Sequence, residues 1–90
     1  MWEKLAEASK IFWYGLYYLL DEEKRSPLGD GEIMGVPLSE GYYLEITKTT
    51  ARIASSGITR TYVKRNSKDA FPYTKLLDWY IKEVIIGKAL

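Results

Sequence analysis

The sequence predicts a small two-layer α+β domain. We expect a helix, a three- or four-stranded antiparallel meander and a second helix, with both helices on one face of the sheet. Three observations predict this class: apolar residues recur at helical spacing near both ends, they alternate along the middle, and turn-forming residues separate the alternating stretches. Ninety residues suit one domain, so we expect residues 1–90 to fold as a single unit.

Residues 2–24 are predicted to form the first helix. One apolar stripe recurs every three or four residues and consists of Leu5, Ala8, Phe12, Leu16 and Leu19. A second stripe consists of Trp2, Ala6, Trp13 and Tyr17. Apart from Gly15, residues 11–20 are all apolar or aromatic, but as a helix they reach only about 15 Å, about half of a bilayer core. We therefore expect no membrane span, and a helix that must be covered on more than one side.

Three stretches in the middle of the chain alternate like strands. Their apolar positions are Met34, Val36 and Leu38, then Tyr42, Leu44 and Ile46, then Ala51 and Ile53. Pro37 has no N–H to donate, which favours an edge strand for the first stretch. The apolar phase changes from even to odd numbers after Ile46, so a turn is predicted at residues 48–50.

Ser56 and Gly57 form a two-residue hairpin signal between the third and fourth strands. A regular hairpin around them pairs Ile53 with Arg60, Arg52 with Thr61, Ala51 with Tyr62, and Thr50 with Val63. This register predicts one face with Ala51, Ile53, Ile58 and Tyr62 turned to the core. It predicts a solvated face with Lys48, Thr50, Arg52, Thr59, Thr61 and Arg65.

The second helix is predicted from residue 69 or 72 to residue 86. Ser67 or Asp69 suits its cap, Pro72 suits its first turn, and Gly87 suits its end. Its predicted inner stripe consists of Leu77, Tyr80, Ile81 and Val84. The order of elements resembles that of the double-stranded RNA-binding domain. That family's Gly-Pro-x-His loop and Lys-Lys-x-Ala-Lys helix start are missing, so no residue roles follow from the resemblance.

The composition excludes several kinds of site. The chain has no Cys and no His, which removes disulfides, the usual structural zinc sites and the commonest catalytic base and soft nucleophile. No catalytic or phosphate-loop motif is present, so we expect a non-enzymatic protein without metal or cofactor, in the cytoplasm. The chain has no Gln and Asn66 as its only Asn, a composition typical of proteins from hot environments, and a viral or archaeal source fits.

Charge is the strongest functional signal in the sequence. Residues 1–47 hold four basic and nine acidic residues, whereas residues 48–68 hold six basic residues and no acid. The six are Lys48, Arg52, Arg60, Lys64, Arg65 and Lys68. Cations on strands can bind phosphates, with neighbouring hydroxyls adding hydrogen bonds. The alternative is that they block pairing at a sheet edge and balance the acidic first helix.

Aromatic residues predict a second kind of surface. The candidates are Trp13, Tyr14, Tyr17, Tyr18 and Trp79. Exposed aromatics of this number exceed what a monomer usually carries in one patch, so we expect a homodimer packed through the first helix. Two functions remain open from the sequence. The first is nucleic-acid binding through the basic hairpin. The alternative is a protein-interaction module, such as an inhibitor, regulator or accessory subunit, that binds a partner protein through the aromatic helix faces and meets an acidic partner with the basic hairpin.

Overall fold

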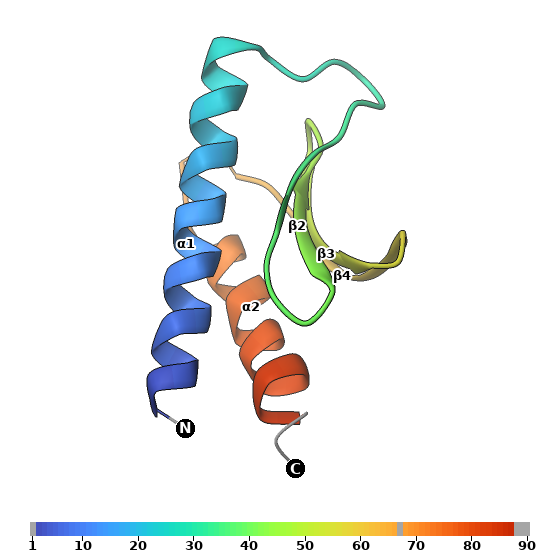
Figure 1. Ribbon diagram of the computed structural model, residues 1–90. Helices are drawn as coiled ribbons and strands as arrows, with labels where there is room; N and C mark the ends of the chain where they lie inside the picture. The colour runs from blue at the N-terminus through green and yellow to red at the C-terminus, as the bar shows by residue number, and fades with distance from the viewer. Residues whose placement is uncertain (1, 67, 88–90) are drawn as a thin grey trace.

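Two helices pack on one face of a four-stranded antiparallel sheet in the computed structural model, which describes residues 2–66 and 68–87 (Figure 1). The predicted α+β class and the placement of both helices are confirmed. The elements in chain order are α1 (Trp2–Arg25), β1 (Met34–Pro37), β2 (Tyr42–Ile46), β3 (Thr50–Ser55), β4 (Ile58–Lys64), α2 (Phe71–Tyr80) and a π-helix, η1 (Ile81–Ile86).

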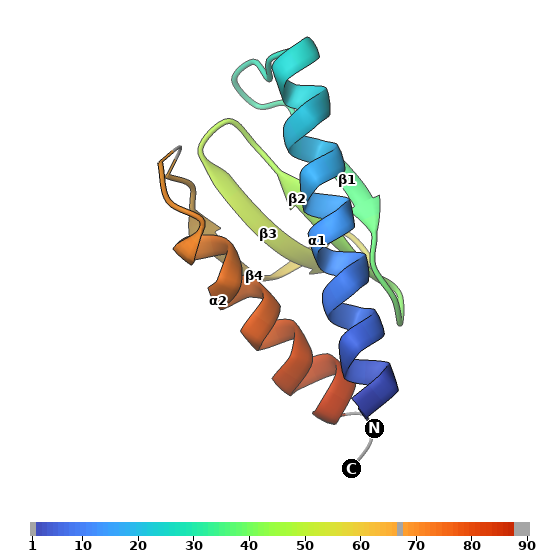
Figure 2. The same ribbon diagram turned by 90° about the vertical axis from the view of Figure 1, so that its left-hand side faces the viewer.

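The sheet is a simple meander with strand order β1-β2-β3-β4. β1, which ends at Pro37, is an edge strand as predicted, and β4 forms the other edge. Figure 2 shows α1 crossing β1 and β2, while α2 lies over β3 and β4. Within the described residues no helix covers the opposite face of the sheet, which we call the helix-free face (Figure 1).

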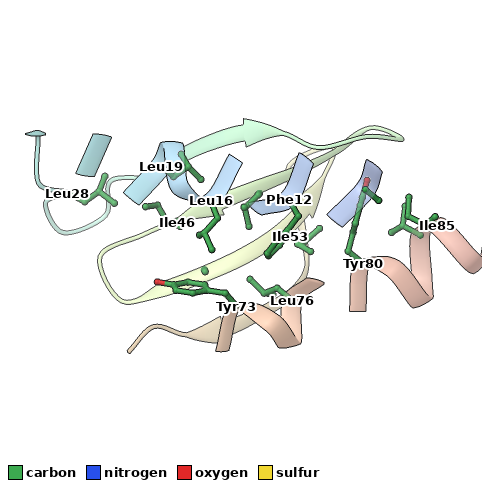
Figure 3. Close-up of a cluster of buried hydrophobic side chains, with 14 residues drawn as sticks. Phe12, Leu16, Leu19, Leu28, Ile46, Ile53, Tyr73, Leu76, Tyr80 and Ile85 are labelled. Atoms are coloured by element: carbon green, nitrogen blue, oxygen red, sulfur yellow. The ribbon is translucent and has the colours of Figure 1, made fainter. Parts of the chain in front are cut away.

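The core lies between the helices and the sheet (Figure 3). The predicted stripe of α1 is confirmed, because Ala8, Phe12, Leu16 and Leu19 are buried and Leu5 packs beside them. The sheet contributes Leu44, Ile46, Ala51 and Ile53. Gly15 lets α1 lie close to β1, since a Cβ at this position would come within 2.9 Å of the Val36 Cγ2 atom.

The C-terminal helix buries a slightly different stripe from the predicted one. Its buried residues are Tyr73, Leu76, Tyr80, Val84 and Ile85. The prediction was correct at Tyr80 and Val84, but the stripe passes through Leu76, and Leu77 and Ile81 lie half-buried beside it. The sequence does not show the wider π-helical turn of η1, which lets consecutive residues reach the core.

Side-chain contacts hold the start of α2 and its last residue in place. Pro72 lies in the first turn, and Asp69 Oδ1 accepts a hydrogen bond of 2.9 Å from the Phe71 N–H. Ser67, the other predicted cap, lies outside the described residues. Further along, the Tyr80 hydroxyl accepts a hydrogen bond from the Ser39 N–H (3.1 Å), which ties α2 to the loop between β1 and β2.

The hairpin turn is the predicted two-residue one, but the pairing beyond it is not. Ser56 (φ 51°) and Gly57 (φ 77°) both adopt the left-handed conformation that such a turn requires. Ala54 pairs with Thr59 and Ile53 pairs with Thr61, so Arg60 is an extra residue in β4. The predicted pairing of Ile53 with Arg60 is therefore wrong by one residue.

This β-bulge at Arg60 reverses the predicted faces of the β4 residues that follow it. Val63 now stands opposite Ala51 and packs against the core, whereas Tyr62 stands opposite Arg52 on the helix-free face. Tyr62 and Ile58, both predicted to face the core, are exposed. Thr61 moves to the core side opposite Ile53, and Arg65 turns toward the helices. A bulge also bends a strand, and the end of the β3–β4 hairpin turns away from the helices (Figure 1).

The bulge predicts that Val63, and not the adjacent Tyr62, contributes to the stability of the fold. Replacing Val63 by Thr places a hydroxyl at the edge of the core and should lower the free energy of unfolding by about 1 kcal/mol. Replacing exposed Tyr62 by Thr, which also favours strands, should change it by less than about 0.5 kcal/mol. Chemical denaturation of both variants measures the difference. A larger loss of unfolding free energy for Tyr62→Thr than for Val63→Thr would support the regular pairing without a bulge.

Candidate nucleic-acid interface

The six basic residues of segment 48–68 do not form one uniform patch. Arg52 and Arg65 are half-buried and each contacts a carboxylate. The other four, Lys48, Arg60, Lys64 and Lys68, are exposed. The sequence does not distinguish these six residues from one another. The structure shows two arginines paired with carboxylates and four exposed cations.

Arg65 is held by three different elements of the fold. Its Nη1 and Nη2 atoms donate to the two carboxylate oxygens of Glu23 in α1 at 2.9 and 2.5 Å. Nη1 also donates to the Thr47 carbonyl oxygen (2.7 Å), and Nε donates to the Tyr73 hydroxyl in α2 (3.1 Å). Only 14% of the Arg65 side chain is exposed. The predicted solvated position of Arg65 is therefore wrong, because its guanidinium is already occupied inside the protein.

This bidentate pair shifts both titrations. The hydrogen bonds from Arg65 lower the pKa of the Glu23 carboxyl below its ordinary value, although partial burial opposes the shift. The hydrogen bond to Glu23 raises the pKa of Arg65, with a smaller contribution from Tyr73. Both groups stay charged at neutral pH, so the pair neutralises one positive charge of the basic segment.

Arg52 lies in the middle of the helix-free face. Its Nε donates to Glu45 Oε1 at 2.9 Å, and pairing across the strands puts Glu45, Arg52 and Tyr62 in one row. The Arg52 side chain is 25% exposed. Its charge is compensated by Glu45, so this row is close to neutral rather than basic.

The exposed cations are more available to a ligand. Lys48 is 3.5 Å from Asp30, but both side chains are largely solvated and such a pair contributes little. In the described part of the chain, no carboxylate lies within 4.0 Å of Arg60, Lys64 or Lys68. Lys64 stands opposite Thr50 on the helix-free face, and Arg60 lies at the bulge of the same strand.

Two exposed tyrosines share the helix-free face with these cations. Tyr43 in β2 is 47% exposed, and Tyr62 in β4 is 63% exposed. Neither is among the candidate site residues predicted from the sequence. The exposure of Tyr43 could have been predicted, because side chains alternate along a strand. Leu44 and Ile46 face the core, so Tyr43 must face the other way. Tyr62 was not detectable, since its face depends on the bulge.

The predicted aromatic interface divides between two places. Tyr14, Tyr17 and Tyr18 are exposed on α1, and Trp13 is half-buried with its ring stacked on Tyr17 at 6.0 Å between centroids. Trp79 belongs to α2 instead, half-buried with its ring 6.4 Å from that of Tyr42. The tyrosines of α1 therefore form the exposed part of this group, and we call these three the α1 tyrosine patch.

A shallow hollow of about 450 Å³ lies beside the loop that joins β4 to α2. Charged residues of both signs line it, namely Glu23, Lys24, Arg65, Lys68 and Asp69. Over the described ranges 2–66 and 68–87, no three His, Cys, Asp or Glu residues gather to hold a metal ion. The same ranges include no helix that is long and apolar enough to cross a membrane.

The Glu23–Arg65 pair predicts a pH-dependent contribution to stability. Glu23→Gln should lower the free energy of unfolding by about 2 kcal/mol at pH 7, because it leaves Arg65 without a charged acceptor. The folded-state pKa of Glu23 is depressed, so its contribution is complete above the pKa of the unfolded chain and disappears as the pH falls through the folded value. The difference between the wild type and the variant should therefore shrink below about pH 4.

Glu22→Gln is the matched control for this experiment. Glu22 pairs with the exposed Arg25 side chain at 3.1 Å on the surface of α1, so its loss should change the unfolding free energy by less than about 1 kcal/mol. Denaturation of both variants between pH 3 and 7 measures the difference. Equal losses for the two variants would show that Glu23 stabilises no more than a surface pair.

Comparison with known proteins gives no relative from which a role can be transferred. No protein-family model, curated protein or solved structure matches this chain.

Proposed function

We propose that this protein binds nucleic acid through the helix-free face of its sheet and the β3–β4 hairpin, without catalysing a reaction. The observation that carries the proposal is the position of Arg60, Tyr62 and Lys64 on β4. All three are exposed, and the two cations have no carboxylate within 4.0 Å in the described chain. An open sheet face with cations beside it offers a continuous surface to a phosphate backbone.

The distribution of charge supports an anionic ligand. The segment from residue 48 to residue 68 carries no acid, whereas the preceding residues 1–47 have a net charge of −5. A protein with this separation turns its basic side toward a polyanion even though its net charge is only +1. Thr50 is opposite Lys64, and Thr59 directly precedes Arg60. The hydroxyl groups of both threonines can add hydrogen bonds to phosphate oxygens.

Arg52 and Arg65, the two arginines paired with carboxylates, shape the binding surface but are not assigned to phosphate contacts. Arg65 anchors the end of β4 and donates all its hydrogen bonds within the protein, so it leaves phosphate binding to its neighbours. Arg52 compensates Glu45, which removes a negative charge from the middle of the surface. Phosphate contacts are therefore assigned to Lys48, Arg60, Lys64 and Lys68.

Salt dependence tests the proposal directly. Four phosphate contacts predict a slope of log K against log salt of about −3.6 for duplex DNA and about −2.8 for a single strand. The double variant Arg60→Ala, Lys64→Ala should weaken binding and flatten the slope by about 1.4 to 1.8. Fluorescence anisotropy with labelled oligonucleotides from 50 to 300 mM salt measures both.

A control variant with the same loss of charge distinguishes a site from a general effect. Lys4→Ala, Lys82→Ala removes two exposed cations from the helices and should leave the slope unchanged. No measurable binding of DNA or RNA at about 50 mM salt, or equal effects of the two double variants, would contradict the proposal.

The α1 tyrosine patch favours a second candidate function, association through α1. Tyr14, Tyr17 and Tyr18 are each more than half exposed along one helix, and clustered aromatics are typical of protein interfaces. A second copy of the chain is the simplest partner for such a patch, because a two-fold dimer covers it on both molecules at once. An acidic partner protein would instead be expected to bind the basic hairpin.

Light scattering tests the dimer. We expect twice the chain mass of 10.4 kDa at micromolar concentration, and a return to the monomer mass when Tyr17 and Tyr18 are both replaced by Glu, because two charges would be buried in the interface. A mass near 10.4 kDa for the unmodified protein, unchanged as the concentration is raised, would contradict self-association.

A further inference from the structure

We infer that the ligand is single-stranded nucleic acid, whose unpaired bases stack on Tyr62 and Tyr43 of the helix-free face. This inference rests on the proposed function and names the ligand class of that same surface. It depends on an observation that the basic segment alone does not give, the two exposed rings on the face that no described helix covers.

The strand register fixes the spacing of the two rings. Tyr43 is opposite Ala54 across β2 and β3, and Tyr62 is opposite Arg52 across β3 and β4. The tyrosines are therefore two strands apart and two residues apart along the strands. With about 4.8 Å between strands and about 3.4 Å per residue, their Cα atoms are separated by about 12 Å. Two rings at this separation offer stacking positions for more than one base.

The sheet surface between the two rings is formed by a small side chain, Ala54, and by Arg52, whose charge is paired with that of Glu45. Ala54 lies beside Tyr43 and is only 3% exposed, yet it is not part of the cluster that fills the core between helices and sheet. Arg52, the other residue between the rings, donates a hydrogen bond from Nε to Glu45 Oε1 in the same row. No described side chain in these two rows adds an unpaired negative charge that would repel a phosphate backbone.

The arrangement fits a single strand better than a duplex. In a duplex each base is stacked on its neighbours, so a tyrosine ring on the protein surface cannot reach a base face without unstacking it. Unpaired bases can turn toward the sheet and stack, while the backbone passes the cations beside them. Arg60 and Lys64 lie two residues before and two residues after Tyr62 on β4, where they can contact the phosphates that flank a base on this ring.

The experiment compares oligonucleotides with and without unpaired bases. Anisotropy at 50 mM salt with a labelled 12-nucleotide single strand and the matching 12-base-pair duplex should show at least about tenfold tighter binding of the single strand. Tyr62→Thr and Tyr43→Thr should each weaken single-strand binding about 5- to 150-fold, the range of one lost base stack. Tyr62→Phe retains the ring and should bind within about twofold of the wild type.

Trp2→Thr is the matched control, since Trp2 at the start of α1 is an aromatic residue with 84% exposure that belongs neither to the sheet nor to the α1 tyrosine patch. It should leave the affinity for the single strand unchanged. Circular dichroism of each variant checks that the fold is retained. If Tyr62→Thr is not folded, the comparison of Tyr43→Thr with Tyr43→Phe tests the same stack.

The outcomes separate this inference from the proposed function. Salt-dependent binding that is equal for single strand and duplex, and unaffected by Tyr62→Thr and Tyr43→Thr, would overturn base stacking and leave phosphate binding in place. Competition by poly-glutamate as effective as that by the single strand would also overturn the inference, because an acidic peptide has no bases. No binding to any oligonucleotide would overturn both.

Discussion

The bidentate pair between Arg65 and Glu23 is the contact on which the arrangement of the elements depends. One guanidinium contacts α1 through Glu23, the turn after β2 through the Thr47 carbonyl, and α2 through the Tyr73 hydroxyl. Arg65 directly follows β4, so these contacts determine where that strand meets the helices. A mostly buried arginine that donates four hydrogen bonds within the protein is costly to displace, since a lost partner would leave a charge unpaired. The pair therefore fixes one end of the β3–β4 hairpin.

The Ser56-Gly57 turn fixes the other end of the β3–β4 hairpin. The bulge lets β4 satisfy both the turn and the contacts of Arg65. Between the turn and Arg65, β4 has seven residues, and an unbroken ladder would put Tyr62 toward the helices and Val63 toward solvent. The extra residue Arg60 reverses this, so that an aliphatic side chain packs on the core and a tyrosine with a polar hydroxyl faces water. The same change turns Lys64 to the helix-free face. The candidate binding surface is thus a consequence of the register that the core requires.

This dependence explains how far the sequence could predict the structure. Local periodicity predicts α1, the phase change after Ile46, the edge position of β1 and the hairpin turn, because each is decided by neighbouring residues. The bulge is decided by competition between Tyr62 and Val63 for the core, and in the stretch 58–64 apolar residues occur at both even and odd positions. The charge run is visible in the sequence, but Lys64 and Arg65 are equally basic. The bulge turns Lys64 to the helix-free face, and contacts with the distant Glu23 and Tyr73 hold Arg65 inside the protein. The cytoplasmic location and the hot-environment source stay predictions from composition.

The two candidate surfaces lie on opposite sides of the molecule, and this placement lets them act together. The exposed tyrosines of α1 lie on the other side of this helix from its buried residues, whereas Tyr43, Tyr62 and Lys64 are on the helix-free face of the sheet. A dimer formed through α1 would therefore leave both helix-free faces open. Two weak surfaces held on one particle bind a long strand more tightly than either alone, because the second contact becomes intramolecular. Association through α1 and binding of a single strand are then complementary rather than competing interpretations. Disrupting the dimer should weaken binding to long strands far more than binding to a strand that covers one sheet face.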